Sequence, residues 1–219
     1  MTDETPPPVH NPQDPKPTGH RWLDMVVAFS ALLISTVSIF VAYQSNQSME
    51  RLTRASSWPF LQIGSGNATD DGVPQLSFAV SNVGTGPARV YDFEMRVDGQ
   101  PLPEGGHLLT RLLLACCEAE LEAAAERAGS RIGAMGQDMS SPVPERFLAP
   151  NGDIYALAWP RTEQNRQLWT ALDMARQGGR ITSTVCYCSV FDECWIAHSN
   201  SFPPEEVNSC QGASPQSTH

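Results

Sequence analysis

Residues 75–99 read QLSFAVSNVGTGPARVYDFEMRVDG, two alternating runs of apolar and polar side chains with a turn between them. Side chains alternate between the two faces of a strand, so Leu76, Phe78 and Val80 fall on one face. The second run, residues 89–97, alternates with one slip in phase, which predicts a β-bulge. The segment therefore predicts two antiparallel strands that each bury one face.

The turn between these runs is rich in residues that stop a strand. Gly84 and Gly86 allow positive φ, Pro87 cannot donate to a ladder, and Asn82 opens the turn. Upstream, we expect the folded domain to begin at Trp58-Pro59, with the indole as a core anchor.

The rest of the chain predicts more strands and two helices. Strand patterns cover residues 153–159, and residues 181–191 and 194–198 form a predicted hairpin. Strong helix formers fill residues 107–127, and a second helix is expected between 162 and 177. The predicted fold class is mainly β (α+β), an antiparallel β-sandwich-like domain with helical insertions.

Residues 25–43, MVVAFSALLISTVSIFVAY, form a run of nineteen residues without a formal charge. A helix of that length spans about 28 Å, close to the ~30 Å hydrocarbon core of a bilayer. Trp22 and Tyr43 flank the run at headgroup level. A buried soluble helix would show a wider polar stripe, and a signal peptide would have a shorter apolar region with a small-residue cleavage site after it. We therefore predict a transmembrane helix at residues 22–44, with the lipid bilayer as its partner.

The predicted helix separates segments of different composition. Residues 1–20 contain six prolines and few large apolar side chains, which predicts a disordered tail. A polar juxtamembrane stalk is expected at residues 45–57, the β-rich domain at 58–202, and a second disordered tail at 203–219. Basic residues on the two sides of the helix nearly balance, so we place the domain outside the cytoplasm because all six cysteines lie in it or in the following tail.

Three cysteines cluster in the predicted C-terminal hairpin, with the spacing C-x-C-x5-C. Cys186 and Cys188 share one face of a strand, and Cys194 lies across the turn. A zinc site could add His198 or Cys210, but the C-x2-C pairs typical of zinc are missing. Redox-active cysteines usually form a C-x-x-C motif at the start of a helix, whereas this pair lies on a predicted strand. The spacing favours structural disulfides, with the metal and redox interpretations as alternatives.

The other cysteines leave the pairing open. Cys116 and Cys117 are adjacent on a predicted helix, where side chains diverge by about 100°, so we expect that they do not bridge each other. Cys210, in the C-terminal tail, is expected either to be free or to link two chains. Six cysteines allow fifteen complete pairings.

Three patches together resemble a group of uncharacterised bacterial membrane-anchored proteins. They are WPFLQI after the membrane helix, SNVGTGPARVYDFEMRVDGQPL, and CYCSVFDECW near the C-terminus. The resemblance implies a bacterial envelope location, and with the orientation above it predicts an inner-membrane protein with a cytoplasmic N-terminus and a periplasmic domain. It implies no activity.

Composition and motifs restrict the function. A net charge of −10 argues against nucleic-acid binding, which needs a basic face. The sequence contains no G-x-S-x-G, H-E-x-x-H or phosphate-loop motif, and we assign no catalytic, cofactor-binding or metal-binding residue. We predict a non-enzymatic, membrane-tethered module that binds an unknown protein partner. The alternatives are a thiol-redox or metal-dependent enzyme using Cys186, Cys188 and Cys194, and a membrane sensor.

Overall fold

The computed structural model describes residues 21–210, so the predicted tail at residues 1–20 lies outside the described residues. The described part of the chain divides into two units, with the boundary between Arg51 and Leu52. Helix α1 spans Arg21–Ser56 and continues through most of the predicted stalk. It is the one helix in the described part of the chain that is long and apolar enough to cross a membrane, a test that a signal sequence also passes.

The polar residues within the apolar run of α1 are satisfied by the helix itself. The hydroxyls of Ser30, Ser35, Thr36 and Ser38 donate to backbone carbonyls four residues earlier, at 2.6 to 2.8 Å. These bonds leave no hydroxyl proton unpaired on an apolar surface, so the four side chains do not disqualify the segment from an apolar surrounding.

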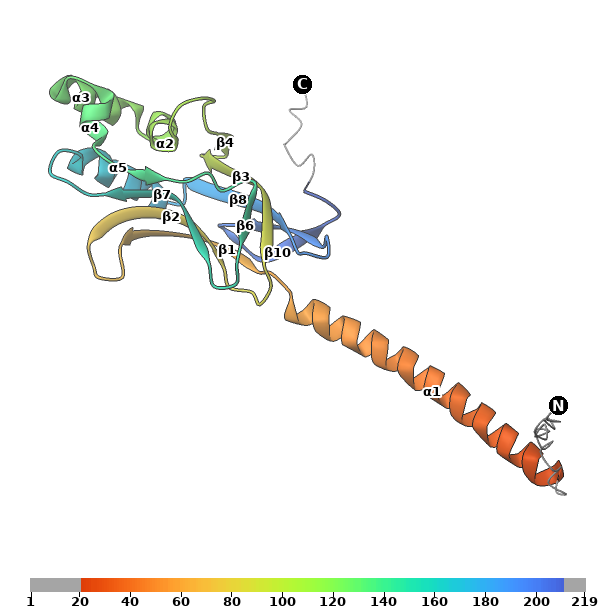
Figure 1. Cartoon of the computed structure of the whole chain (residues 1–219). Coiled ribbons are helices and arrows are strands. Elements are labelled where there is room, and N and C mark those ends of the chain that lie inside the picture. The colour runs from red at the N-terminus through yellow and green to blue at the C-terminus, as the bar shows by residue number, and fades with distance from the viewer. Residues whose placement is uncertain (1–20, 211–219) are drawn as a thin grey trace, which may run out of the picture. The chain divides into compact units, whose positions relative to one another are not determined.

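The second unit contains two antiparallel sheets (Figure 1). The first has the order β1-β2-β7-β5, with strands β1 (Leu61–Ala68), β2 (Pro74–Asn82), β7 (Asp153–Pro160) and β5 (Met139–Ser140). The second has the order β10-β9-β8-β3-β4, with strands β10 (Ser201–Val207), β9 (Cys194–His198), β8 (Ile181–Cys188), β3 (Ala88–Val97) and β4 (Gln100–Pro101). A short strand, β6 (Arg146–Leu148), also pairs with β3. The prediction of a β-rich α+β fold is confirmed.

The alternation in residues 75–97 sets which faces are buried. Leu76, Phe78 and Val80 are at most 3% exposed, while the residues between them are half-buried. The predicted slip in the second run is a shift in the β3–β8 register between Val90 and Asp92, which confirms the bulge. Apolar side chains of both sheets meet in one cluster that includes Leu61, Val80, Ala156, Val90, Val185 and Tyr187.

Four helices pack on one another beside the sheets (Figure 1). They are α2 (Leu108–Cys116), α3 (Glu118–Ala128), α4 (Arg131–Met135) and α5 (Arg166–Gln177). Their leucines join Trp159 and strand residues in a second apolar cluster. The prediction of one helix over residues 107–127 is wrong in one respect, because two helices, α2 and α3, cover this range and Cys117 separates them.

The prediction of a disordered tail from residue 203 is also wrong for its first part. Residues 203–207 belong to β10, which pairs with β9, and Cys210 is 6% exposed and forms a disulfide. The polar composition of FPPEEVNSC hid this strand, because an edge strand needs few apolar side chains. Residues 211–219 lie outside the described part of the chain.

Candidate functional site

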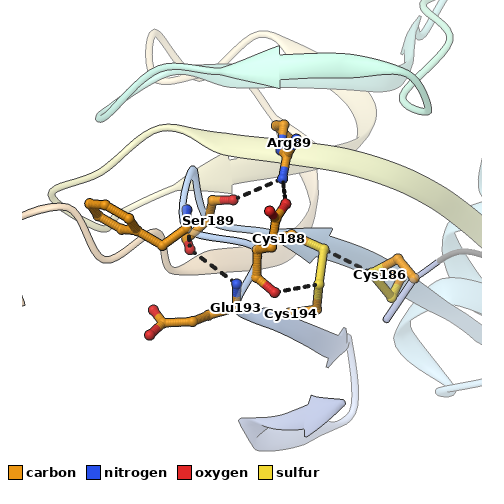
Figure 2. The surroundings of a disulfide bond; sticks show 9 residues. Arg89, Cys186, Cys188, Ser189, Glu193 and Cys194 are labelled. Atoms are coloured by element: carbon orange, nitrogen blue, oxygen red, sulfur yellow. Dashed lines mark hydrogen bonds and ion pairs between the residues drawn. A yellow bond between two sulfur atoms is a disulfide. The ribbon is translucent and has the colours of Figure 1, made fainter. Parts of the chain in front are cut away.

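The predicted cysteine hairpin forms between β8 and β9. Cys188 and Cys194 lie directly opposite each other in this register and form a disulfide. The connecting turn is held by Ser189, whose amide donates to the Glu193 carbonyl at 2.7 Å and whose hydroxyl accepts from the amides of Phe191 and Glu193 (Figure 2). The Arg89 guanidinium, on β3, contacts Asp192 and the Ser189 carbonyl. The turn is therefore fixed by the backbone and by the neighbouring strand.

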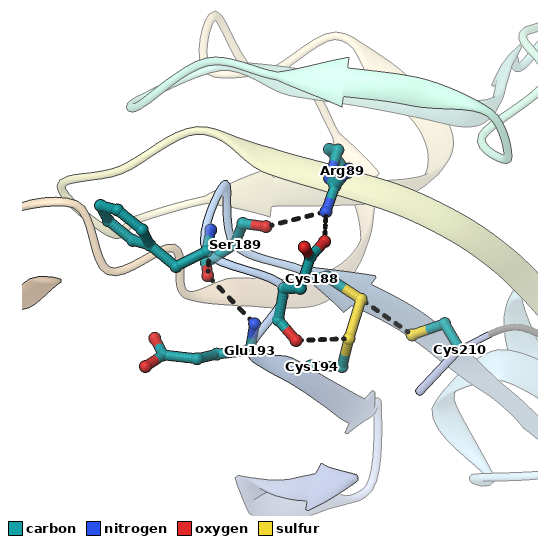
Figure 3. Close-up of polar contacts among 8 residues, drawn as sticks. Arg89, Cys188, Ser189, Glu193, Cys194 and Cys210 are labelled. Atoms are coloured by element: carbon teal, nitrogen blue, oxygen red, sulfur yellow. Dashed lines mark hydrogen bonds and ion pairs between the residues drawn. A yellow bond between two sulfur atoms is a disulfide. The ribbon is translucent and has the colours of Figure 1, made fainter. Parts of the chain in front are cut away.

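A second disulfide lies against the first. Cys186 bonds Cys210 and so ties the chain after β10 to β8. The Cys188 and Cys210 Sγ atoms lie 3.7 Å apart (Figure 3). All four cysteines are 3 to 6% exposed and pack against Tyr91, Ile196 and Val207.

This arrangement bears on the three interpretations of the cysteines. The sulfurs of Cys188, Cys194 and Cys210 lie within 4.8 Å of one another, so the reduced chain would offer three metal ligands. As disulfides they lack the thiolate charge that a metal requires. Their burial also keeps them from an attacking thiol, as redox exchange would need. The bonded form therefore acts as a structural staple.

The expectation that Cys116 and Cys117 do not bridge each other is wrong. They form a disulfide between neighbouring residues. The expectation assumed a continuous helix, but Cys117 has φ −147° and ψ 42°, which lies outside the helical region and ends α2. The bond lies between α2 and α3, and Cys116 packs against the apolar cluster of the helices, apart from the cluster of the hairpin cysteines.

The predicted turn residues lie where the backbone of the turn at residues 82–86 crosses the backbone at the start of the domain. Asn82 is 1% exposed, and its side chain makes four hydrogen bonds: Nδ2 donates to the carbonyls of Gly86 and Leu148, and Oδ1 accepts from the amides of Phe60 and Gly84. The Trp58 carbonyl accepts from the amides of Thr85 and Gly86. The turn thus clamps the start of the domain to β2, which gives the Asn-x-Gly-x-Gly pattern a structural role.

Trp58 is not the core anchor that we expected. Its side chain is 47% exposed, and its ring makes T-shaped contacts with the rings of Phe60 and Trp195. Phe60 in turn lies against Phe202, which is 75% exposed. We call these four side chains, Trp58, Phe60, Trp195 and Phe202, the aromatic surface. A small cavity of about 210 Å³ borders it, lined by residues of β1, β9 and β10.

The structure also brings together three residues that the sequence did not single out. The Ser140 Oγ lies 2.8 Å from the His107 Nε2, and the His107 Nδ1 lies 3.5 Å from the Asp138 Oδ2. Burial raises the pKa of the Asp138 carboxyl, and the neighbouring His107 acts in the opposite direction. No short motif could have revealed this group, because His107 and Ser140 are 33 residues apart in sequence.

No known protein-family model, curated protein or solved structure matches this chain. The resemblance to bacterial membrane-anchored proteins therefore stays a prediction.

Proposed function

We propose that this protein is a membrane-tethered module of the bacterial envelope that binds a protein partner through its aromatic surface. Residues 22–44 serve as the anchor in the inner membrane, and the two sheets form a β-sandwich-like domain in the periplasm. The observation that carries the proposal is the exposure of Trp58 and Phe202 beside a cavity. Exposed aromatic groups with a polar rim are typical of binding hot spots.

The occupant that suits this surface is an extended protein segment with an apolar side chain. The cavity has room for about one such side chain. It lies between β1 and β10, each of which is the edge strand of its sheet. Edge strands accept extended segments, while His198, Ser199 and Ser201 supply polar groups at the rim.

The periplasmic location is supported by the disulfides. All six cysteines are paired, and such bonds persist in oxidising compartments. In a reduced cytosol, two staples on the C-terminal hairpin would open and β10 would lose its covalent tie. The burial of the sulfurs weighs against the redox alternative, whereas the sensor alternative rests on residues 1–20, outside the described part of the chain.

The location is tested by a thiol-trapped, non-reducing peptide map of the full chain extracted from membranes. We expect linked peptides for Cys186–Cys210 and Cys188–Cys194. Metal analysis of the same sample serves as the control for the alternative site. Free thiols at these four positions would contradict the periplasmic location. Free thiols together with stoichiometric zinc would support the metal-binding alternative in place of the structural disulfides.

Binding is tested by placing a photo-crosslinking phenylalanine analogue at position 202 of the full chain in living cells. Phe147, on β6, is a matched control because it is 73% exposed, close to the 75% of Phe202. We expect a discrete adduct from position 202 and none from position 147. Trp58→Ala should reduce the affinity of the purified adduct partner about tenfold, the effect typical of a hot-spot aromatic. Equal adducts from both positions, or an adduct insensitive to Trp58→Ala, would refute the proposal.

A further inference from the structure

His107, Asp138 and Ser140 come from three segments that the fold brings to one place. His107 precedes α2 in an extended conformation, after Gly105 and Gly106, which both have positive φ. Ser140 ends β5 and is fixed by its pairing with Leu157 of β7. A helix start and a paired strand are firm supports, so the contact between the imidazole and the hydroxyl does not depend on a long loop.

Asp138 is the third member of the group and lies on the Nδ1 side of the imidazole, opposite the nitrogen that contacts Ser140. Its side chain is 12% exposed and its buried Oδ2 accepts no hydrogen bond within the described residues, while it faces the His107 Nδ1 at 3.5 Å. A buried carboxylate oxygen without a donor is costly unless a charge forms beside it. An imidazolium at His107 would supply that charge, and the carboxylate favours the tautomer with its proton on Nδ1.

A cavity opens beside the imidazole and the hydroxyl. It has a volume of about 610 Å³, within the range of small-molecule sites, and His107 and Ser140 both line it. Leu102, Leu108 and Val143 contribute apolar wall, and the Arg111 side chain supplies a positive charge. A nucleophile, a base and a carboxylate in this order beside a cavity are the geometry of acyl transfer.

We propose that Ser140 is the nucleophile of a hydrolytic site for carboxylic esters with apolar acyl groups, with His107 as its base and Asp138 as a positioning residue. This activity goes beyond the binding role proposed above and departs from the non-enzymatic prediction. It was missed because the three residues carry no sequence motif. The apolar wall selects the acyl group.

The steps balance without any co-reactant other than water. The Ser140 Oγ attacks the ester carbonyl carbon while its proton passes to the His107 Nε2. The bond to the alcohol oxygen then breaks, and the imidazolium returns that proton to the leaving alcohol. Water next gives a proton to His107 and attacks the acyl-serine, which releases the carboxylic acid and restores the Ser140 hydroxyl.

The test uses the full chain in detergent with a fluorophosphonate probe and with p-nitrophenyl butyrate. We expect a covalent adduct that peptide mass spectrometry places on Ser140, and loss of both labelling and ester hydrolysis by at least about 100-fold in Ser140→Ala and His107→Gln. Ser65, an exposed serine on β1, does not line this cavity, so Ser65→Ala is the control and should leave both rates unchanged. Thermal denaturation of each variant checks that it is folded.

Two further variants separate chemistry from packing. Asp138→Asn should slow hydrolysis more than tenfold, and Asp138→Glu should recover part of the rate, because only a carboxylate favours the correct imidazole tautomer. Crosslinking from position 202 should persist in Ser140→Ala, so failure of one proposal does not imply failure of the other. Folded protein without an adduct on Ser140, or hydrolysis that survives Ser140→Ala, would overturn the assignment.

Discussion

Gly86→Ala is expected to lower the free energy of unfolding by about 3 kcal/mol, the upper end of the usual cost of overpacking. A Cβ at this position would lie 1.8 Å from the Ser57 carbonyl oxygen and 2.1 Å from its carbonyl carbon. Both atoms are backbone, so no side chain can rotate away. Relief would require the start of the domain to move off the turn, which would break the hydrogen bond from the Gly86 amide to the Trp58 carbonyl.

Urea denaturation of the full chain in detergent measures this effect, and Gly64→Ala is its matched control. Gly64 also lies near the start of the domain, in β1, but nothing lies within 4 Å of the position of its Cβ. We expect the control to denature at or slightly above the urea concentration of the unaltered protein, because alanine reduces the freedom of the unfolded chain. Similar midpoints for both variants would contradict the close backbone crossing.

Removal of the Cys186–Cys210 disulfide by the double change Cys186→Ala and Cys210→Ala should cost about 3.5 kcal/mol. The two cysteines are separated by 24 positions, so the bond restricts a long loop of the unfolded chain. In the folded state it retains β10 at the edge of the sheet. Thermal or urea denaturation reports the loss, and proteolysis near residue 203 should become faster as β10 detaches.

The second staple of the hairpin provides the comparison. Cys188 and Cys194 are separated by only 6 positions, so the double change to alanine should cost about 2.3 kcal/mol, less than the first pair. Alanine keeps both sites apolar, which limits the packing loss in this buried cluster. A larger cost for the short loop than for the long one would show that packing, not chain restriction, is the main contribution of the disulfides.

Local pattern was a good guide where a short segment decides its own structure. The alternation of Leu76, Phe78 and Val80 predicted the buried face of β2, and the slip after Val90 predicted the bulge in β3. Both follow from the period of a strand, which a few consecutive residues display. The pairing of β8 with β9 could also be predicted, because the two strands are close in sequence.

Local pattern failed where a distant partner decides. Cys117 belongs to a run of strong helix formers, yet its disulfide and its backbone angles divide the helix. Trp58 looked like a core residue, but the amides of Thr85 and Gly86 hold its carbonyl and its ring stays at the surface. Residues 203–207 looked unstructured, although pairing with β9 orders them.

The apolar anchor candidate at residues 22–44, the β-rich class of the domain and the turns between its strands could all be predicted from the residues alone. Each of them depends on composition or on a short period. The pairing of the cysteines, the exposure of the aromatic side chains and the meeting of His107 and Asp138 with Ser140 beside a cavity could be seen only in the folded chain. These outcomes depend on contacts between residues far apart in the chain, and such contacts form only when two sheets and four helices pack around shared apolar clusters.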